Sequence, residues 1–380
     1  MIVFASLIPS KFAMIIANSA KAIRLISVNT KGIKLNKKNT NLAEFFPMIR
    51  SREQVIKSIK SKPKLLAVYN SWRKEQQEEF LSLCTGAKGA KMLYDSYFKE
   101  ILNPELEPER LSKLLSLLMK RNVTVKEVLA NDNSRLGDEM SLVITDIVVE
   151  LEDGTIANVE VQRLGYAFTG ERASCYSADL LLRQYKRVRD RMKKNFSYKD
   201  IAPVYTIVFM EKSPSSFKHF SNCYVHQLQT ISDTGIKLNM LQNYIFIPVD
   251  IFLEKLHNEG INNELEAWLT FLGCDEPEYI SLLIDQYPYF KPLYSDLYDI
   301  CKNTEKVIEM FSKELQILDR NTVKYMIDEL QEQLDDTKVQ LDDAKVQLDD
   351  TKEQLDDAKK ELISKDKYIA ELEAKLKANN

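Results

Sequence analysis

The sequence predicts an α/β domain with a helical C-terminal region and a long coiled-coil tail. The α/β assignment rests on four apolar segments rich in β-branched residues, at 143–151, 155–162, 204–210 and 244–249. A long helical segment at 170–194 separates the second of these from the third. The tail is predicted from a seven-residue repeat near the C-terminus. With 380 residues, 44% hydrophobic and 29% charged, the chain is long enough for one sizeable core and its appendages.

The stretch 141–162 (SLVITDIVVELEDGTIANVEVQ) predicts two β-strands joined by a tight turn at 152–155. Three side chains are unusual in such apolar strands: Asp146, Glu160 and Gln162. Because side chains alternate between the two faces of a strand, Glu160 and Gln162 must share one face. The apolar residues of the other face are Ala157, Val159 and Val161 from the second strand and Ile147, Val149 and Leu151 from the first.

This pattern also predicts the register of the hairpin. If the two apolar sets pack side by side, Asp146 lies on the same face as Glu160 and Gln162. A two-residue Asp153-Gly154 turn would pair residues whose numbers sum to 307, which mixes the faces. An even sum is needed, so we expect a three-residue loop or a bulge with Gly154 at positive φ.

Two carboxylates and an amide on one sheet face form an all-oxygen donor set. Hard divalent cations such as Mg2+ or Mn2+ accept such a set, with water and substrate phosphate completing the shell. A bound metal lowers the pKa of its water and stabilises charge on a phosphate in transfer. The alternative for Asp146 or Glu160 alone is a place on the solvated face of an antiparallel sheet. The joint pattern with the glycine turn favours the metal site.

Further segments give the hairpin a context. They are YDSYFK at Tyr94–Lys99, GERASCYSADLLLRQY at Gly170–Tyr185, PVYTIVF at Pro203–Phe209 and YVHQ at Tyr224–Gln227. Together with the order Asp146, turn, Glu160-Val161-Gln162, they resemble the PD-(D/E)XK nuclease superfamily. Within it the chain is similar to the PD-(D/E)XK nuclease family transposases and the bacterial recombination-promoting nucleases. The likeness covers roughly 94–250, about two fifths of the chain.

The resemblance implies a restriction-endonuclease-like αβββαβ core and a catalytic set of Asp146, Glu160 and Gln162. Asp146 and Glu160 would hold the metal, joined by the backbone carbonyl of Val161. Gln162 stands where the superfamily usually has lysine; glutamine orients water or a phosphate oxygen but carries no charge. This branch is known to use glutamine there. The resemblance also places Arg183 and Gln184 beside the active site, and it implies that a helix of the 71–120 region backs the sheet.

The predicted helix at 170–194 is strongly basic. Arg172, Arg183, Lys186 and Arg187 are the candidates for contacts with a phosphate backbone, which need charge but read no sequence. The alternative is a solvated basic helix end that complements the helix dipole. Asp95 is expected to be ordinary helix surface, although it could join the site. A lone histidine such as His226 is more often structural than catalytic.

The chain divides by composition into four parts: a basic extension at 1–62, a nuclease-like domain at 63–255, a helical subdomain at 256–320 and a coiled coil at 321–380. We expect the extension to be a flexible, solvated segment that leads into the domain. The first part has twelve Lys or Arg against two Glu. Five scattered cysteines and three histidines argue against a disulfide scaffold and a structural zinc site, and fit a reducing cytosol. We therefore expect a cytoplasmic protein with no membrane partner and no small-molecule cofactor.

The tail repeats QLDDTKV-like heptads from about residue 327 to 376. One heptad position holds leucine, at Leu334, Leu341, Leu348, Leu355 and Leu362, and its companion holds Thr337, Ala344, Thr351 and Ala358. This predicts a coiled coil that makes a homo-oligomer, with a thin seam because small residues fill every second layer. The alternative is a solitary charged helix stabilised by Asp–Lys pairs.

Two functions follow. The first is a Mg2+-dependent (or Mn2+-dependent) DNA endonuclease of the transposase or recombination-promoting type. The second is a non-catalytic module on a degenerate nuclease fold that binds nucleic acid or protein and is oligomerised by its tail. The two functions differ in what they predict for Asp146 and Glu160: side chains on the same face of the sheet favour the enzyme, and side chains on opposite faces favour the binding module.

Overall fold

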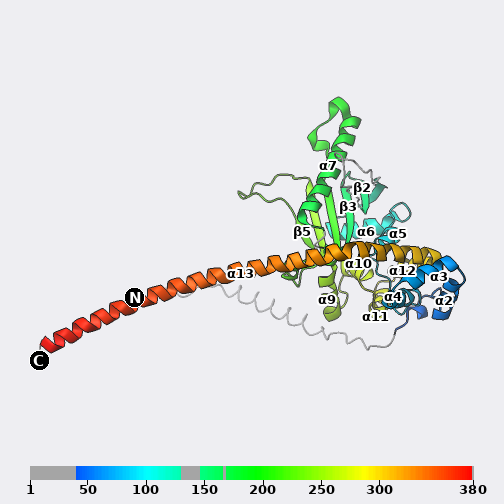
Figure 1. The fold of residues 1–380 in the computed structure, drawn as a ribbon. Coiled ribbons are helices and arrows are strands. Elements are labelled where there is room, and N and C mark those ends of the chain that lie inside the picture. The colour runs from blue at the N-terminus through cyan, green and yellow to red at the C-terminus, as the bar shows by residue number, and fades with distance from the viewer. Residues whose placement is uncertain (1–39, 130–145, 166–167, 379–380) are drawn as a thin grey trace, which may run out of the picture. The chain divides into compact units, whose positions relative to one another are not determined.

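The computed structural model describes residues 40–129, 146–165 and 168–378. Within these ranges the chain forms two compact units, with the boundary between Leu315 and Gln316. The first unit holds a six-stranded sheet and most of the helices, and the second is the remainder of one long helix, α13 (Thr304–Ala378). Figure 1 shows these elements with their labels.

The sheet has the strand order β1-β2-β3-β4-β6-β5. Its strands are β1 (Val125–Val128), β2 (Ile147–Leu151), β3 (Ile156–Leu164), β4 (Val204–Lys212), β5 (His226–Leu228) and β6 (Gln242–Pro248). The pairs β3–β4 and β4–β6 are parallel, and the other three are antiparallel. The apolar run of β4 is buried and central, as its continuous hydrophobicity predicts. Pro248 ends β6, where its missing N–H does not interrupt the ladder.

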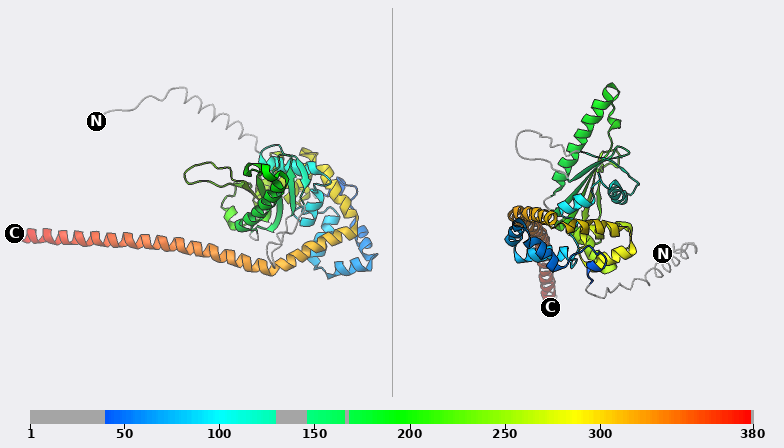
Figure 2. Two further views of the ribbon diagram at one scale, coloured as in Figure 1. Left: turned by 90° about the horizontal axis from the view of Figure 1, so that it is seen from above. Right: turned by 90° about the vertical axis from the view of Figure 1, so that its right-hand side faces the viewer.

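The core follows the order α6–β1–β2–β3–α7–β4, which is the expected αβββαβ succession. The helix α6 (Pro108–Met119) buries Leu111, Leu114, Leu115 and Leu118, the residues that its periodicity assigns to the core. The helix α7 (Gly170–Met192) lies along one face of the sheet (Figures 1 and 2), where Ala173, Tyr176 and Leu180 meet apolar residues of β2, β3, β4 and β6.

The opposite face of the sheet meets α5 (Asp95–Ile101). Phe98 of α5 and Phe209 of β4 are both buried, with ring centroids 6.1 Å apart. Tyr97 and Ile101 of α5 are buried as well. Because α5 is packed against the central strand, its polar residues have fixed positions at the edge of the sheet.

The remaining helices of the first unit surround a second apolar centre. They are α2 (Arg52–Lys60), α3 (Pro63–Ser71), α4 (Lys74–Cys84), α9 (Val249–Glu259), α10 (Glu264–Gly273), α11 (Pro277–Gln286) and α12 (Phe290–Lys302), with the short α8 (Ser215–Lys218) beside the sheet. Trp268 and Phe290 lie 5.1 Å apart between ring centroids, and Phe271 and Tyr294 lie 5.0 Å apart. Trp268, Phe271, Phe290 and Tyr294 are therefore core residues, whereas Tyr289 is exposed.

The expected divisions at residues 62 and 255 do not appear in the described residues. Phe46, from the segment predicted to be a flexible lead-in, is buried against Tyr298 of α12 with centroids 5.0 Å apart. Val55 and Ile59 of α2 are also buried, and Arg50 donates to the carbonyl of Cys301. Residues 40–62 and the helical region thus belong to the same compact unit as the sheet. The first 39 residues of the predicted extension lie outside the described ranges.

The tail helix α13 runs without interruption to Ala378, as the absence of proline and glycine predicts. Its heptad leucines are half exposed or more in this single chain, from 50% for Leu334 to 64% for Leu362. Across the described residues, no helix is both long enough and apolar enough to cross a membrane.

Candidate active site

The β2–β3 hairpin has the register that its pattern predicts. Ile147 pairs with Val159, Val148 with Asn158 and Val149 with Ala157, so every pair sums to 306. The Leu151 N–H bonds the carbonyl of Thr155 at 2.8 Å, which closes a three-residue loop. Gly154 has φ +82°, a conformation that other residues rarely adopt. The predicted even register and the positive φ are both confirmed.

Asp146 and Glu160 meet at the open end of this hairpin. Asp146 directly precedes β2, and the register places it opposite Glu160 on the same face. The backbone N–H of Asp146 donates to Glu160 Oε1 at 3.3 Å, and the Val161 N–H donates to Asp146 Oδ2 at 2.8 Å. The Glu160 carboxylate is therefore held by the backbone of Asp146, and the Asp146 carboxylate by the backbone of Val161, the residue after Glu160. The Asp146 side chain is 14% exposed and Glu160 2%.

The backbone of Val161 also points toward Asp146. In a strand the N–H and C=O of one residue are directed to the same neighbouring strand. Since the Val161 N–H reaches Asp146, its carbonyl is directed to that edge too, beyond the residue where β2 begins. A backbone oxygen and two carboxylates thus converge on this corner of the sheet.

The helix α5 adds two residues to this corner. Lys99 Nζ lies 3.1 Å from Asp146 Oδ1 and 2.7 Å from Asp95 Oδ1. The Asp95 charge in turn raises the pKa of Asp146. Asp95 was expected to be ordinary helix surface, but the structure brings it to the site. The contribution of Lys99 was not foreseen from the sequence, although YDSYFK was part of the resemblance.

Burial disfavours the charged forms of both carboxylates. Burial is the largest cause that raises the pKa of Asp146 to about 6, and the charge of Lys99 opposes it. Burial, followed by the negative charge of Asp146, raises the pKa of Glu160 to about 8. The two groups titrate as a pair, so at neutral pH the metal-free site holds a proton. A divalent cation would remove this penalty by compensating both charges.

Arg172 lies near the pair at the first turn of α7. Its charge is among the effects that lower the pKa of Glu160. The guanidinium donates to the Tyr176 hydroxyl at 2.8 Å and lies 5.0 Å from the centre of the Phe168 ring. These contacts hold an exposed positive charge beside the acidic pair. Gln162 is half-buried and lies two residues after Glu160 in β3, so it shares the face of Glu160.

The other candidates of α7 lie away from this corner. Arg183 forms an ion pair with the buried Asp179 at 2.7 Å. Gln184 is 3% exposed; its oxygen accepts the Ala202 N–H at 2.8 Å, and its amide makes a long 3.5 Å bond to the carbonyl of Gly154. Gly154 lies at the opposite end of the hairpin, six residues or about 20 Å from Glu160. Gln184 therefore ties α7 to the turn.

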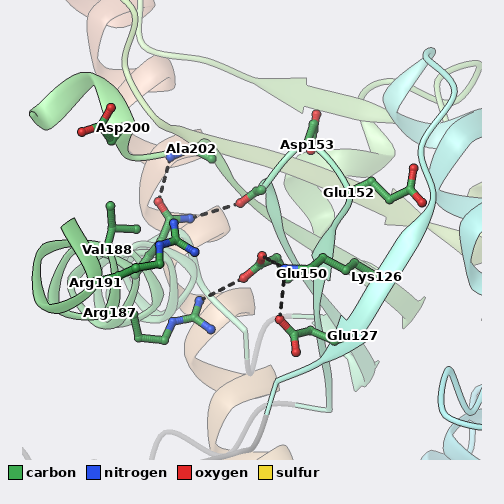
Figure 3. Close-up of a pocket in the computed structure, with 12 residues that line it drawn as sticks. Lys126, Glu127, Glu150, Glu152, Asp153, Arg187, Val188, Arg191, Asp200 and Ala202 are labelled. Atoms are coloured by element: carbon green, nitrogen blue, oxygen red, sulfur yellow. Dashed lines mark hydrogen bonds and ion pairs between the residues drawn. The ribbon is translucent and has the colours of Figure 1, made fainter. Parts of the chain in front are cut away.

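The turn end of the hairpin has a cavity of about 540 Å³, shown in Figure 3. Arg187 contacts Glu150 at 3.7 Å there, and Lys126 contacts Glu150 at 2.8 Å. Arg191 also lines the cavity, and the exposed Lys186 directly precedes Arg187 on the same helix. The lining has five acidic residues, Glu127, Glu150, Glu152, Asp153 and Asp200, against three basic ones. This charge does not suit a phosphate.

The donor set fits Mg2+ or Mn2+ better than a metal that needs a full protein cage. No group of three or more His, Cys, Asp or Glu residues that could hold a metal occurs in the described ranges. Mg2+ typically uses one or two carboxylates and keeps waters or substrate phosphates as its other ligands. Asp146, Glu160 and the Val161 carbonyl supply such an oxygen-only set.

His226 lies in β5, two strands beyond β4, and its ring contacts Phe217 edge-on with centroids 4.9 Å apart. Its Nε2 lies 3.0 Å from the carbonyl of Cys223. Because neighbouring strands are about 4.8 Å apart, His226 is roughly 14 Å from β3, in agreement with a structural role.

The fold, the hairpin register and the paired carboxylates together define a PD-(D/E)XK type of nuclease core. The sequence matches the family described as PD-(D/E)XK nuclease family transposase over residues 92–356, more than half of the chain. The chain belongs to this family. Neither the search of curated proteins nor the search of solved structures gave a match.

Proposed function

We propose that this protein is a metal-dependent endonuclease that hydrolyses phosphodiester bonds of DNA, of the transposase or recombination-promoting type. The observation that carries the proposal is the shared face of Asp146 and Glu160, whose pKa values are raised and whose carboxylates accept hydrogen bonds from the backbone of Asp146 and Val161. Buried neighbouring carboxylates whose pKa values are raised by burial and by mutual repulsion are typical of functional sites. Membership of a nuclease family is consistent with it.

In this proposal Asp146, Glu160 and the carbonyl of Val161 hold Mg2+ or Mn2+. The metal, when bound, lowers the pKa of water and offsets charge on the phosphate. Gln162 orients the attacking water through its amide oxygen, and Arg172 binds the phosphate backbone beside the cut. The water oxygen forms a bond to phosphorus and releases its proton to solvent. The bond from phosphorus to the leaving sugar oxygen breaks, and that oxygen takes a proton from solvent.

Plasmid cleavage with Mg2+ or Mn2+ tests this assignment. We expect nicking by the wild type and a loss of about 10³-fold in Asp146→Asn and in Glu160→Gln, since a metal supplies several kcal/mol. Glu150→Gln is the matched control, because Glu150 lies on the same face of β2 but at the turn end. Its rate should stay within about threefold of the wild type.

Absence of cleavage by folded wild type with either metal would contradict the enzyme. The non-catalytic binding module would then replace it, and the uncharged Gln162 is the feature that favours that second function. Equal cutting by wild type and both carboxylate variants would indicate a contaminating nuclease.

We further propose that the chain acts as a homo-oligomer through a coiled coil at 327–376. The leucine position repeats every seven residues and remains about half exposed in one chain. Replacing Leu341 and Leu348 by Asp should convert the oligomer to a monomer in sedimentation velocity. Replacing Val339 and Val346 by Asp is the control, because these residues are equally exposed on the same helix but outside the predicted seam. A wild-type monomer at micromolar concentration would contradict the coiled coil.

A further inference from the structure

Lys99 is placed against the proposed metal site by two carboxylates. Its ammonium lies 3.1 Å from Asp146 on the hairpin and 2.7 Å from Asp95 one helical turn earlier. The side chain is 36% exposed, so it is partly accessible to a ligand. Among the residues that the structure describes, Lys99 is the cation that forms an ion pair with Asp146.

The backbone that carries Lys99 is firmly held. The neighbouring Tyr97 and Phe98 are fully buried. At the start of α5, Glu314 accepts the Ser96 N–H at 3.2 Å and the Ser96 hydroxyl at 3.1 Å. Glu100 pairs with Lys306 at 2.6 Å. The backbone from which Lys99 extends is therefore fixed beside the site, as a reacting group requires.

The strand β3 provides no positive charge on the face of Glu160, because position 162 holds a glutamine. Gln162 carries an amide, which donates and accepts hydrogen bonds but does not compensate a developing negative charge. An ammonium is a compact cation with three donors on a flexible stem, so it can move from a carboxylate to a phosphate oxygen nearby. Asp95 would remain paired with the Lys99 ammonium when Asp146 binds the metal.

We infer that Lys99 is a catalytic residue that supplies, from α5, the positive charge that residue 162 does not provide. Its ammonium donates to a non-bridging oxygen of the scissile phosphate and stabilises the charge that grows there as the P–O bond to the leaving oxygen breaks. Asp95 is the positioning residue that holds Lys99. The inference rests on the proposed nuclease function.

A purely structural ion pair is the competing explanation, and the chain offers a matched control for it. Lys91, eight residues earlier, has a side chain 35% exposed and lies 3.0 Å from Glu79. It therefore resembles Lys99 in exposure and in pairing but has no contact with Asp146 or Glu160. A structural role predicts similar effects of Lys91→Met and Lys99→Met.

The test compares these two variants with the wild type in DNA cleavage, in DNA affinity and in Mn2+ affinity by calorimetry. We expect Lys99→Met to lose about 10²-fold in turnover, as for removal of one transition-state donor, with DNA affinity within about threefold. Its Mn2+ affinity should stay equal or rise, because a cation competing for Asp146 is gone. Lys91→Met should change none of the three. Added methylammonium should restore part of the Lys99→Met activity, and Lys99→Arg should retain more than Lys99→Met.

Turnover by Lys99→Met within about threefold of the wild type would overturn the inference while leaving the nuclease intact. Loss of Mn2+ affinity together with turnover would also overturn it, because Lys99 would then only hold Asp146 in place. If Lys99→Met does not fold, Lys99→Arg decides, since inactivity of a folded, charge-keeping variant beyond rescue contradicts a phosphate-binding cation. If the wild type cuts nothing, the proposed function fails and this inference fails with it.

Discussion

The two ends of the β2–β3 hairpin hold similar carboxylates in opposite electrostatic conditions. At the turn end, Glu150 contacts Lys126 and Arg187, and Asp153 contacts Arg121 at 2.6 Å. Burial opposes the ionisation of Asp153, but the Thr155 backbone and hydroxyl and Arg121 together hold its pKa below the usual value. At the open end, burial raises the pKa values of Asp146 and Glu160, and Lys99 compensates only part of their charge.

Within one hairpin, the carboxylates at the turn end are paired with cations, whereas those at the open end are buried with incomplete charge compensation. Paired carboxylates at the turn stabilise the hairpin or cost it little. Two buried carboxylates that repel each other lower stability, so a fold gains nothing from them unless a ligand uses them. This difference supports the proposal that the open end binds a cation, while the turn end supports α7 through Gln184.

The largest expected effect is on the pH dependence of stability in the metal-free protein. In the folded state Glu160 keeps its proton up to about pH 8, whereas its ordinary pKa is 4.5. The folded chain therefore holds an extra proton between these values, and the free energy of unfolding falls as pH rises through that window. Glu160→Gln should remove a loss on the order of 3 kcal/mol between pH 5 and pH 8, measured by urea unfolding in EDTA.

Glu150→Gln serves as the control for this measurement, because the charge of Glu150 is compensated by two cations. It should leave the pH profile with the shape of the wild type. A profile for Glu160→Gln that parallels the wild type would mean that Glu160 is ionised and solvated, and the contrast between the two ends would disappear. Mn2+ should stabilise the wild type most at pH 8.

Much of this arrangement was predictable because it depends on local patterns. The alternation of apolar residues in the hairpin gave the register, and the need for an even pairing sum gave the positive φ of Gly154. The apolar periodicity of α6 and the continuous run of β4 gave their burial. Each of these features depends on one or two neighbouring elements, in which the periodicity of the apolar side chains determines the register and the buried face.

Contacts between distant segments were not predictable in the same way. Lys99 and Asp146 are 47 residues apart, and nothing in the sequence of α5 distinguishes Lys99 from a solvated lysine. The predicted phosphate role of Gln184 shows the same difficulty, because its amide is buried between Ala202 and Gly154. The short strands β1 and β5, of four and three residues, have too few positions to show a period. Burial of Phe46 likewise depends on helices 250 residues later.

Gln184→Ala should have the next largest effect, and only at the turn end. The variant leaves the part-buried Ala202 N–H without its 2.8 Å partner, which should lower the free energy of unfolding by about 1 kcal/mol. Turnover measured on the folded variant should remain that of the wild type, because the site lies at the far end of β3. Lys186→Ala, an exposed neighbour, should change neither quantity. Loss of turnover without loss of stability would place Gln184 in the site after all.

The smallest expected effect compares Arg172 with Arg187, which lie on the same helix at the two ends of the hairpin. In a Glu160→Gln background that cannot cut, Arg172→Ala should weaken DNA binding about fivefold and reduce the slope of log Kd against log salt concentration by about 0.9, as for one lost phosphate contact. Arg187→Ala should leave the slope unchanged, because Arg187 contacts Glu150 in a cavity with an acidic lining. Fluorescence anisotropy across a salt series measures both. Equal slopes for the two variants would show that DNA runs along the whole of α7, and the turn end would then have a binding role that its charge does not suggest.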